Sequence, residues 1–318
     1  MKYIKKFDQH SDYADYKESQ DFTRPNISVC GGGDGELHYN KLNGDKFISV
    51  VSSDGGSVYV IHWNDLGKGD EFPFPFSEIE VDGVDRTQDV IDGEGMLQLT
   101  AGKHVVKYTL DDPNNTDSLF WDVANMLSVV IPDTTTELGL NMFNSAISLK
   151  NVNLPDGLSV IGVQAFDACK NMRRIAIPDG VVEIGDHAFG GCSSLLSVRI
   201  PNSVTTIGNH VFFQCTNLLA VDLGTGITQI GESTFARCAN LRELEIPEGI
   251  TAIGRNTFED CFLLESVIMR PTTPPTLGAD VFIGCSNFKI YVPQGSLTTY
   301  RTATGWSDYA SSIRAITE

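Results

Sequence analysis

Six cysteines recur at a nearly constant spacing, and they are the first pattern in this chain that could carry chemistry. They are Cys169, Cys192, Cys215, Cys238, Cys261 and Cys285, separated by four steps of 23 residues and one of 24. Thiols can hold zinc, form disulfides or act as nucleophiles. No CxxC pair accompanies them, and Cys30 makes the total odd, which argues against a zinc finger or a complete disulfide framework. We therefore expect small, buried side chains at one position of a repeated unit.

Two histidines share the same spacing. His187 and His210 lie 23 residues apart, and Asp186 precedes the first. If residues one period apart are neighbours in space, two imidazoles and a carboxylate could hold zinc or nickel. The alternative, which we favour, is a pair of solvent-exposed side chains at a variable position of the repeat.

Three other segments have residue types that suit a site. The acidic run Asp82, Asp85, Asp89, Asp92 and Glu94 lacks the order of an EF-hand loop, so we expect a solvated loop. The glycine-rich segment 31–35 lacks the Lys-Ser/Thr of a phosphate-binding loop. Cys30 and His38 are the nearest approach to a nucleophile and base, but closeness in sequence is poor support for such a pair. We predict no catalytic residue, no cofactor and no metal site, and hence a protein that is not an enzyme.

Composition narrows the partners. The chain has 318 residues and a net charge of -18, whereas nucleic-acid binding needs clustered Lys and Arg. No stretch of 18 apolar residues is present, so we expect no membrane insertion. The start carries Lys2, Lys5 and Lys6 but no following apolar run, so no signal peptide is predicted.

The cysteine period governs other residue types as well. Glycine recurs at Gly139, Gly162, Gly185, Gly208, Gly231 and Gly254, proline at Pro132, Pro155, Pro178, Pro201 and Pro247, and phenylalanine at Phe143, Phe166, Phe189, Phe212, Phe235, Phe258 and Phe282, with Phe120 one period earlier. A single 23-residue unit cannot bury its own apolar residues, whereas stacked units can. We predict an α/β solenoid of short parallel strands, with the phenylalanines stacked inside.

Each part of the unit has an expected role. The segment Leu218–Leu223 alternates in the manner of a short strand, and a proline at the corresponding point of most units ends it. The glycine after Ile207 suits a turn with positive φ. The stretch around Phe212 is expected to form one short helical turn on the opposite wall.

These repeats, with the order Pro, Val/Ile, Ile-Gly, Phe, Cys, Leu and Val, resemble the BspA-like leucine-rich repeat family. The resemblance covers about residues 118–293 and extends to the segment Val292–Ser296 with Tyr300 and Trp306. It implies a surface or secreted bacterial protein, often an adhesin, whose repeats are not enzymatic. It also implies an extracellular or cell-surface location. The absence of a signal peptide leaves a cytoplasmic or virion-associated location as the alternative.

The two ends differ from the repeats. We predict an N-terminal leader segment over 1–44, a small all-β sandwich over 45–110, the solenoid over 111–293 and a C-terminal cap over 294–318. In the sandwich, Gly55-Gly56 is expected to join two strands as a hairpin, and the last strand is expected to run directly into the first coil. Tyr300 and Trp306 are expected to cover the end of the stack, and an aromatic ligand site is the alternative.

The outward positions of the strands are where a partner is expected to bind. The candidate residues are Arg174, Arg199, Asp222, Glu243 and Glu245, a basic spot followed by an acidic one. No aromatic ladder for sugar rings lies on this face, which favours a protein partner or a host surface. These charges can equally form salt bridges among themselves. We predict a non-catalytic protein-interaction or adhesion module. A structural part of a larger assembly, such as a phage or prophage virion, is the first alternative, and an enzyme in the N-terminal region is the second.

Overall fold

The computed structural model describes residues 117–122, 126–131 and 133–317, and the backbone of six earlier strands. These strands are β1 (Phe47–Ser52), β2 (Ser57–Tyr59), β3 (Phe76–Val81), β4 (Val84–Asp85), β5 (Met96–Gln98) and β6 (His104–Leu110). The predicted leader, the glycine-rich segment, Cys30 with His38 and most of the acidic run lie outside the described residues.

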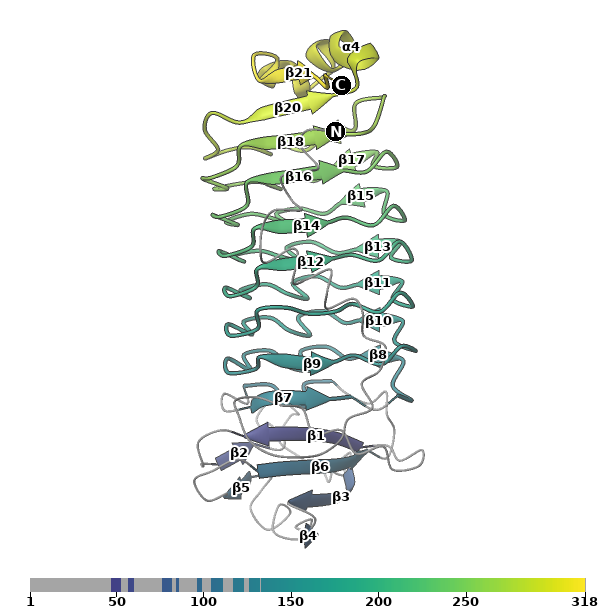
Figure 1. Ribbon diagram of the computed structural model, residues 1–318, viewed down its shortest axis with the longest axis vertical. Helices are drawn as coiled ribbons and strands as arrows, with labels where there is room; N and C mark the ends of the chain where they lie inside the picture. The colour runs from purple at the N-terminus through teal and green to yellow at the C-terminus, as the bar shows by residue number, and fades with distance from the viewer. Residues whose placement is uncertain are drawn as a thin grey trace, which may run out of the picture.

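The chain from Asp117 onward winds into a stack of coils, and each coil has three walls (Figure 1). The strand wall holds β7 (Met126–Val130), β9 (Asn151–Asn153), β12 (Ser197–Arg199), β14 (Ala220–Asp222), β16 (Glu243–Ile246), β18 (Ser266–Met269), β20 (Lys289–Val292) and β21 (Ile313–Ala315). The second wall holds β8 (Glu137–Leu138), β10 (Val160–Ile161), β11 (Glu183–Ile184), β13 (Thr206–Ile207), β15 (Gln229–Ile230), β17 (Ala252–Ile253) and β19 (Thr276–Leu277). The third, which we call the turn wall, holds the phenylalanine segments.

Strands one period apart pair in parallel, as predicted. Ser197 pairs with Ala220 in β12 and β14, and Val160 pairs with Glu183 in β10 and β11. In β16, Leu244 and Ile246 face the core while Glu243 and Glu245 face outward, because side chains alternate along a strand. The predicted parallel solenoid with a 23-residue period is confirmed.

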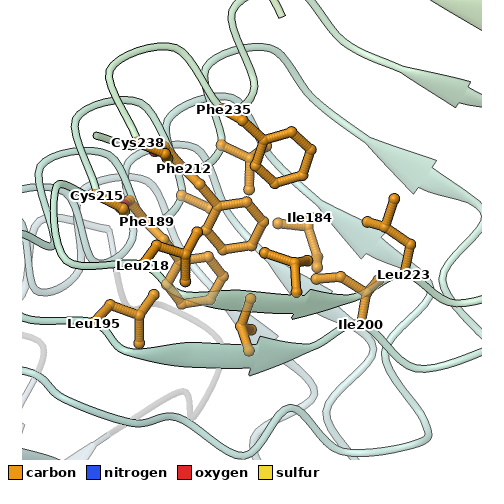
Figure 2. Packing of buried hydrophobic residues seen from close by; sticks show 14 of the residues in the cluster. Ile184, Phe189, Leu195, Ile200, Phe212, Cys215, Leu218, Leu223, Phe235 and Cys238 are labelled. Carbon is orange, nitrogen blue, oxygen red and sulfur yellow. The ribbon is translucent and has the colours of Figure 1, made fainter. Parts of the chain in front are cut away.

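The phenylalanines form one continuous column inside the stack. Eight of them, from Phe120 to Phe282, follow one another with ring centroids 5.2–5.8 Å apart, and the rings lie nearly parallel. Figure 2 shows three of these rings, with leucines and isoleucines of the strand wall and the second wall packed around them. The predicted internal stack is confirmed, and it places the core at the centre of every coil.

The helical part of the α/β prediction is wrong for the coils. The segments around Phe166 and Phe189 are tight turns, and each phenylalanine N–H donates to the next coil, as from Phe166 to Ala188 at 2.8 Å. Two residues of most turns have positive φ, for example His187 and Gly191. Helices within the described residues lie only after β20, as η1 (Gln294–Ser296), α4 (Leu297–Thr302) and η2 (Trp306–Tyr309).

The reason expected for the repeated glycine is also wrong. Within the described residues, only Gly191, Gly284 and Gly305 among the glycines have positive φ, so the column glycines lie elsewhere in φ. The column is instead required by the close approach of successive coils. A Cβ built on Gly185 would lie 2.6 Å from the backbone N of Val163, inside the contact limit.

The strand wall is not one uninterrupted sheet. Its ladders are β7 with β9, β12 with β14, and β16 with β18, β20 and β21. Residues 172–178 are described but form no strand, so the strand predicted around Arg174 is wrong.

The strands of 47–110 join the solenoid differently from the prediction. β1 pairs antiparallel with both β6 and β7, which gives the order β4-β3-β6-β1-β7-β9. β1 therefore lies between β6 and the first coil in the sheet, although β6 is the strand that precedes β7 along the chain. β2 pairs with β5 rather than β1, so the hairpin at Gly55-Gly56 is wrong as well. Apart from the exposed Val84, the side chains of these strands lie outside the described residues, and the sandwich stays a prediction.

The segment after β20 lies on the last coil, at the top of Figure 1. Tyr300 and Trp306 are fully buried and contact each other edge to face. The Tyr300 hydroxyl donates to the Pro271 carbonyl at 2.8 Å, and the Trp306 indole N–H donates to the Pro275 carbonyl at 2.7 Å. Both rings are thus buried and both polar groups are hydrogen-bonded within the chain. This arrangement leaves neither ring available for the alternative of an aromatic ligand site.

Candidate functional site

The thiol column is structural. Each Sγ lies 3.0–3.2 Å from the carbonyl oxygen of the phenylalanine one coil earlier, as from Cys215 to Phe189. Five of the six thiols are buried, and Cys285 is partly exposed. Burial raises the pKa of each thiol, and that of Cys285 to about 11. Raised pKa values disfavour the reactive thiolate.

Alkylation should therefore follow burial. In a Cys30→Ser background, iodoacetamide is expected to modify Cys285 first and the other five column thiols only after unfolding, because a buried neutral thiol is both inaccessible and weakly nucleophilic. Mass spectrometry of peptides after timed labelling measures the order. Rapid native labelling of Cys192 or Cys215 would contradict the packing described here.

The predicted partner-binding residues are distributed along the strand wall, and most of them contact other charged or polar groups. Arg199 pairs with Asp179 at 2.8 Å, and Arg270 contacts Glu245 through two nitrogens at 2.8 and 3.0 Å. The Ser266 hydroxyl donates to Glu243 at 2.7 Å. Part of the predicted basic and acidic surface is therefore already engaged in ion pairs and hydrogen bonds within the protein. Exposed ion pairs of this kind contribute about 0–1 kcal/mol each, so these residues remain open to competition by a partner.

Asp222 and Arg174 complete the predicted set. Asp222 faces outward from β14. Partial shielding by the neighbouring coils raises the pKa of Asp222, Arg199 lowers it and Glu245 raises it. Arg174 is exposed, in the coil that forms no strand. The structure thus brings Arg199, Asp222 and Glu245 onto three successive coils of one face.

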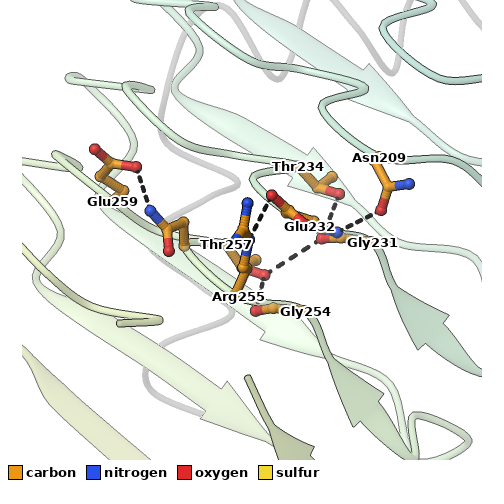
Figure 3. Close-up of polar contacts among 9 residues, drawn as sticks. Asn209, Gly231, Glu232, Thr234, Gly254, Arg255, Thr257 and Glu259 are labelled. Atoms are coloured by element: carbon orange, nitrogen blue, oxygen red, sulfur yellow. Dashed lines mark hydrogen bonds and ion pairs between the residues drawn. The ribbon is translucent and has the colours of Figure 1, made fainter. Parts of the chain in front are cut away.

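A polar ladder at the start of the turn wall was not predicted. Asn209 N–H donates to the Asp186 carboxylate at 2.6 Å, and Glu232 N–H donates to the Asn209 side chain at 2.8 Å. Arg255 then pairs with Glu232 at 2.6 Å (Figure 3). These residues follow the column glycines at one-period spacing, and this register is the signal that could have revealed them. The ladder joins coils, so Asp186 has a structural role.

His187 and His210 are stacked, as the period predicts. Their ring centroids lie 4.5 Å apart with planes 4° apart, and Phe213 contacts both rings edge to face. Both side chains are half-buried rather than fully exposed. Among the described residues, no group of three or more His, Cys, Asp or Glu side chains is arranged to hold a metal.

The histidine stack predicts a dependence of stability on pH. Partial burial lowers the pKa of His210 from 6.5, and so does His187, whereas Glu232 and Asp186 raise it and Arg255 lowers it. Because the pKa of His210 is lower in the folded state than in the unfolded state, the unfolded state binds this proton more readily. The protein therefore has its full stability above pH 6.5 and loses part of it as the pH falls below that value. We expect the urea midpoint to drop more between pH 7.5 and pH 5 in the native protein than in His210→Asn. Asparagine tolerates the positive φ of 57° at this position. An equal drop in both proteins would exclude this effect.

Comparison with known proteins decides the family. A family model described as the BspA type leucine rich repeat region, with six copies, matches residues 116–224 and 213–304, more than half of the chain. The chain belongs to this family. No curated protein is similar enough in sequence to count as a relative. No helix in the described part of this BspA-type chain is long and apolar enough to cross a membrane.

Several solved structures are similar to this BspA-type chain. A leucine-rich repeat protein from Bacteroides ovatus is 22% identical, with a TM-score of 0.48, over 66% of this chain and 65% of that one. The T. pallidum leucine rich repeat protein is 25% identical, with a TM-score of 0.41, over 52% and 73%. A leucine rich cell surface protein from Faecalibacterium prausnitzii is 25% identical, with a TM-score of 0.38, over 57% and 64%.

Proposed function

We propose that this chain is a non-catalytic interaction module that binds a protein partner through its strand wall. BspA-type repeat proteins are generally protein-interaction or surface modules. The observation that carries the proposal is the contrast between inside and outside. The core positions repeat from coil to coil and are fully buried, whereas the outward strand positions change from coil to coil.

The changing positions give the strand wall a charge order that a partner can match. Arg174 and Arg199 lie toward the N-terminal side, and Asp222, Glu243 and Glu245 follow on the next coils. A partner with an acidic region beside a basic one would be oriented by this order, because complementary charges fix the register of an interface. We propose these five residues as the contact surface, on a protein located at the cell surface.

We also propose that the two ends cap the stack. An open end exposes core and unpaired strand edges, which favour aggregation. The antiparallel β1 against β7 and the segment of Tyr300 and Trp306 on the last coil suit this role. Caps at both ends would then prevent aggregation through the open ends of the stack, while the strand wall remains available to a partner.

Site-specific photo-crosslinking tests the contact surface. A benzophenone amino acid at Ala176, on the strand wall, is expected to capture one discrete protein from whole-cell preparations of the source organism or its host surface. The same group at Val182, which is 44% exposed near the second wall, is the matched control and should capture none. Arg174→Glu/Arg199→Glu should abolish the Ala176 product, whereas Arg255→Glu, on another wall, should preserve it.

Two results would remove this assignment. One is capture from Val182 but not from Ala176, which would place the interface elsewhere. The other is an undiminished Ala176 product in the double charge reversal. Circular dichroism melting of each variant separates loss of binding from loss of folding.

A further inference from the structure

A cleft of about 550 Å³ opens on the turn wall, away from the proposed partner face. Its lining comes from four successive coils and includes Asp167, Lys170, His187, Phe213 and Arg237. Sites for small molecules have volumes of roughly 300–1,000 Å³. The cleft is thus large enough for one small ligand.

Two small residues at one repeated position form the floor of the hollow. The second position after the core phenylalanine carries Gln214 and Arg237 in the two later coils, but Ala168 and Gly191 in the two earlier ones. Coils repeat about every 4.8 Å, so Asp167 and Phe213, two coils apart, stand about 10 Å from each other along the stack. Gly190, between them, is buried: a Cβ there would lie 2.7 Å from the Asp167 carboxylate and 3.1 Å from His187 Nδ1. The carboxylate and the imidazole therefore cover Gly190 and form one side of the hollow.

The charge of the cleft is opposite to that of the protein. Lys170 and Arg237 line it, on a chain of net charge -18. The acid among the lining residues is Asp167, and burial raises the pKa of its carboxyl, against the effects of His187 and Gln164. Arg237 lies over the Phe213 ring at 5.4 Å and is 3.9 Å from Asp260, a loose ion pair. The cleft therefore favours an anion.

The remaining lining residues suit a polyol. Ser193, Gln214 and Thr216 supply hydroxyl and amide groups that both donate and accept hydrogen bonds. Phe213 adds an apolar ring beside them. The next coil carries Glu259 and Asp260 at the positions after its core phenylalanine, so the positive charge is confined to this hollow. A long acidic peptide would meet these carboxylates, whereas a single ring would not.

We propose that this cleft binds a sugar residue that bears a carboxylate. The carboxylate is held by Lys170 and Arg237, the ring lies over Ala168 and Gly191 beside Phe213, and the hydroxyls are bound by the polar side chains of the wall. The site lies on a different wall from the proposed partner face and does not depend on it.

Isothermal titration of the full chain with D-glucuronate, and separately with D-glucose, tests this site. We expect glucuronate to bind at least tenfold more tightly than glucose, since a hydrogen bond to a charged group is stronger than one to a neutral hydroxyl. Lys170→Ala should weaken glucuronate binding about tenfold, and Phe213→Ala should weaken glucuronate and glucose alike. Lys289→Ala, on the strand wall, is the matched control and should leave the affinity unchanged.

Three results would overturn the proposal. Equal affinities for glucose and glucuronate would show that the carboxylate is not recognised. An unchanged affinity in Lys170→Ala would place binding outside the cleft. A Glu-Glu dipeptide that binds more tightly than glucuronate, with the same loss in Lys170→Ala, would assign the cleft to acidic peptides. Crosslinking from Ala176 in Lys170→Ala should be normal, which separates a failure here from a failure of the proposed function.

Discussion

Phe212→Ala is expected to lower the free energy of unfolding by about 3–5 kcal/mol. The ring lies in the middle of the column, fully buried, 5.6 Å from Phe189 and 5.7 Å from Phe235. Its removal leaves a cavity between two coils that the backbone contacts above and below prevent from closing. Urea denaturation followed by circular dichroism measures the change.

Phe262→Ala is the matched control for this prediction. Phe262 is 58% exposed on the turn wall, so its truncation should change stability by no more than about 0.5 kcal/mol. Equal effects at the two positions would mean that Phe212 does not lie in a packed interior.

Gly185→Ala is expected to destabilise the fold by about 1–3 kcal/mol through overpacking. The added methyl would lie 2.6 Å from Val163 N and 2.8 Å from Gly162 C, both backbone atoms of the preceding coil. Relief requires the two coils to separate, which would also lengthen the hydrogen bond from Gly185 N–H to Ile161 O, now 2.8 Å. Thermal melting and urea midpoints measure the effect.

Gly249→Ala is the corresponding control. Its Cβ would lie 3.7 Å from the nearest backbone oxygens, an ordinary contact, and its φ is not positive. The substitution should be neutral or stabilise by about 0.4–1 kcal/mol, because alanine restricts the unfolded chain. A destabilised Gly249→Ala with an unaffected Gly185→Ala would refute close approach as the reason for the glycine column.

The period alone predicted the central features of the fold. Residues at 23-residue spacing had to share one environment, so the phenylalanines and cysteines were correctly placed inside and the strands were correctly paired in parallel. The reason for the glycine was missed because it depends on the distance between coils. The turns around the phenylalanines were mistaken for helix because their hydrogen bonds run to the next coil, which no local pattern shows.

The pairing of the early strands was also beyond the sequence. A glycine pair between two apolar runs favours a hairpin, yet β1 pairs with β6 and β7, far along the chain. Such long-range pairing depends on which sheet edge is open. The first coil offers its edge at β7, and β1 occupies it.

The candidate surfaces could be predicted to different degrees. The outward strand positions follow from the period, but their internal ion pairs, such as Arg270 with Glu245, required coordinates. The turn-wall cleft combines residues from four coils around Ala168 and Gly191 and has no linear motif. Its sequence signal is a pair of small residues at one position of a column that carries larger side chains in the following coils.

Distances between spin labels along the strand wall test the stacking of coils most directly. Labels at positions 153 and 245 are four coils apart, and labels at positions 153 and 291 are six coils apart. With a rise of about 4.8 Å for each coil, pulsed electron–electron double resonance should give distances of about 19 and 29 Å, each narrowly distributed. Two distances that do not increase in proportion to the number of coils would contradict the solenoid and every surface assigned to it.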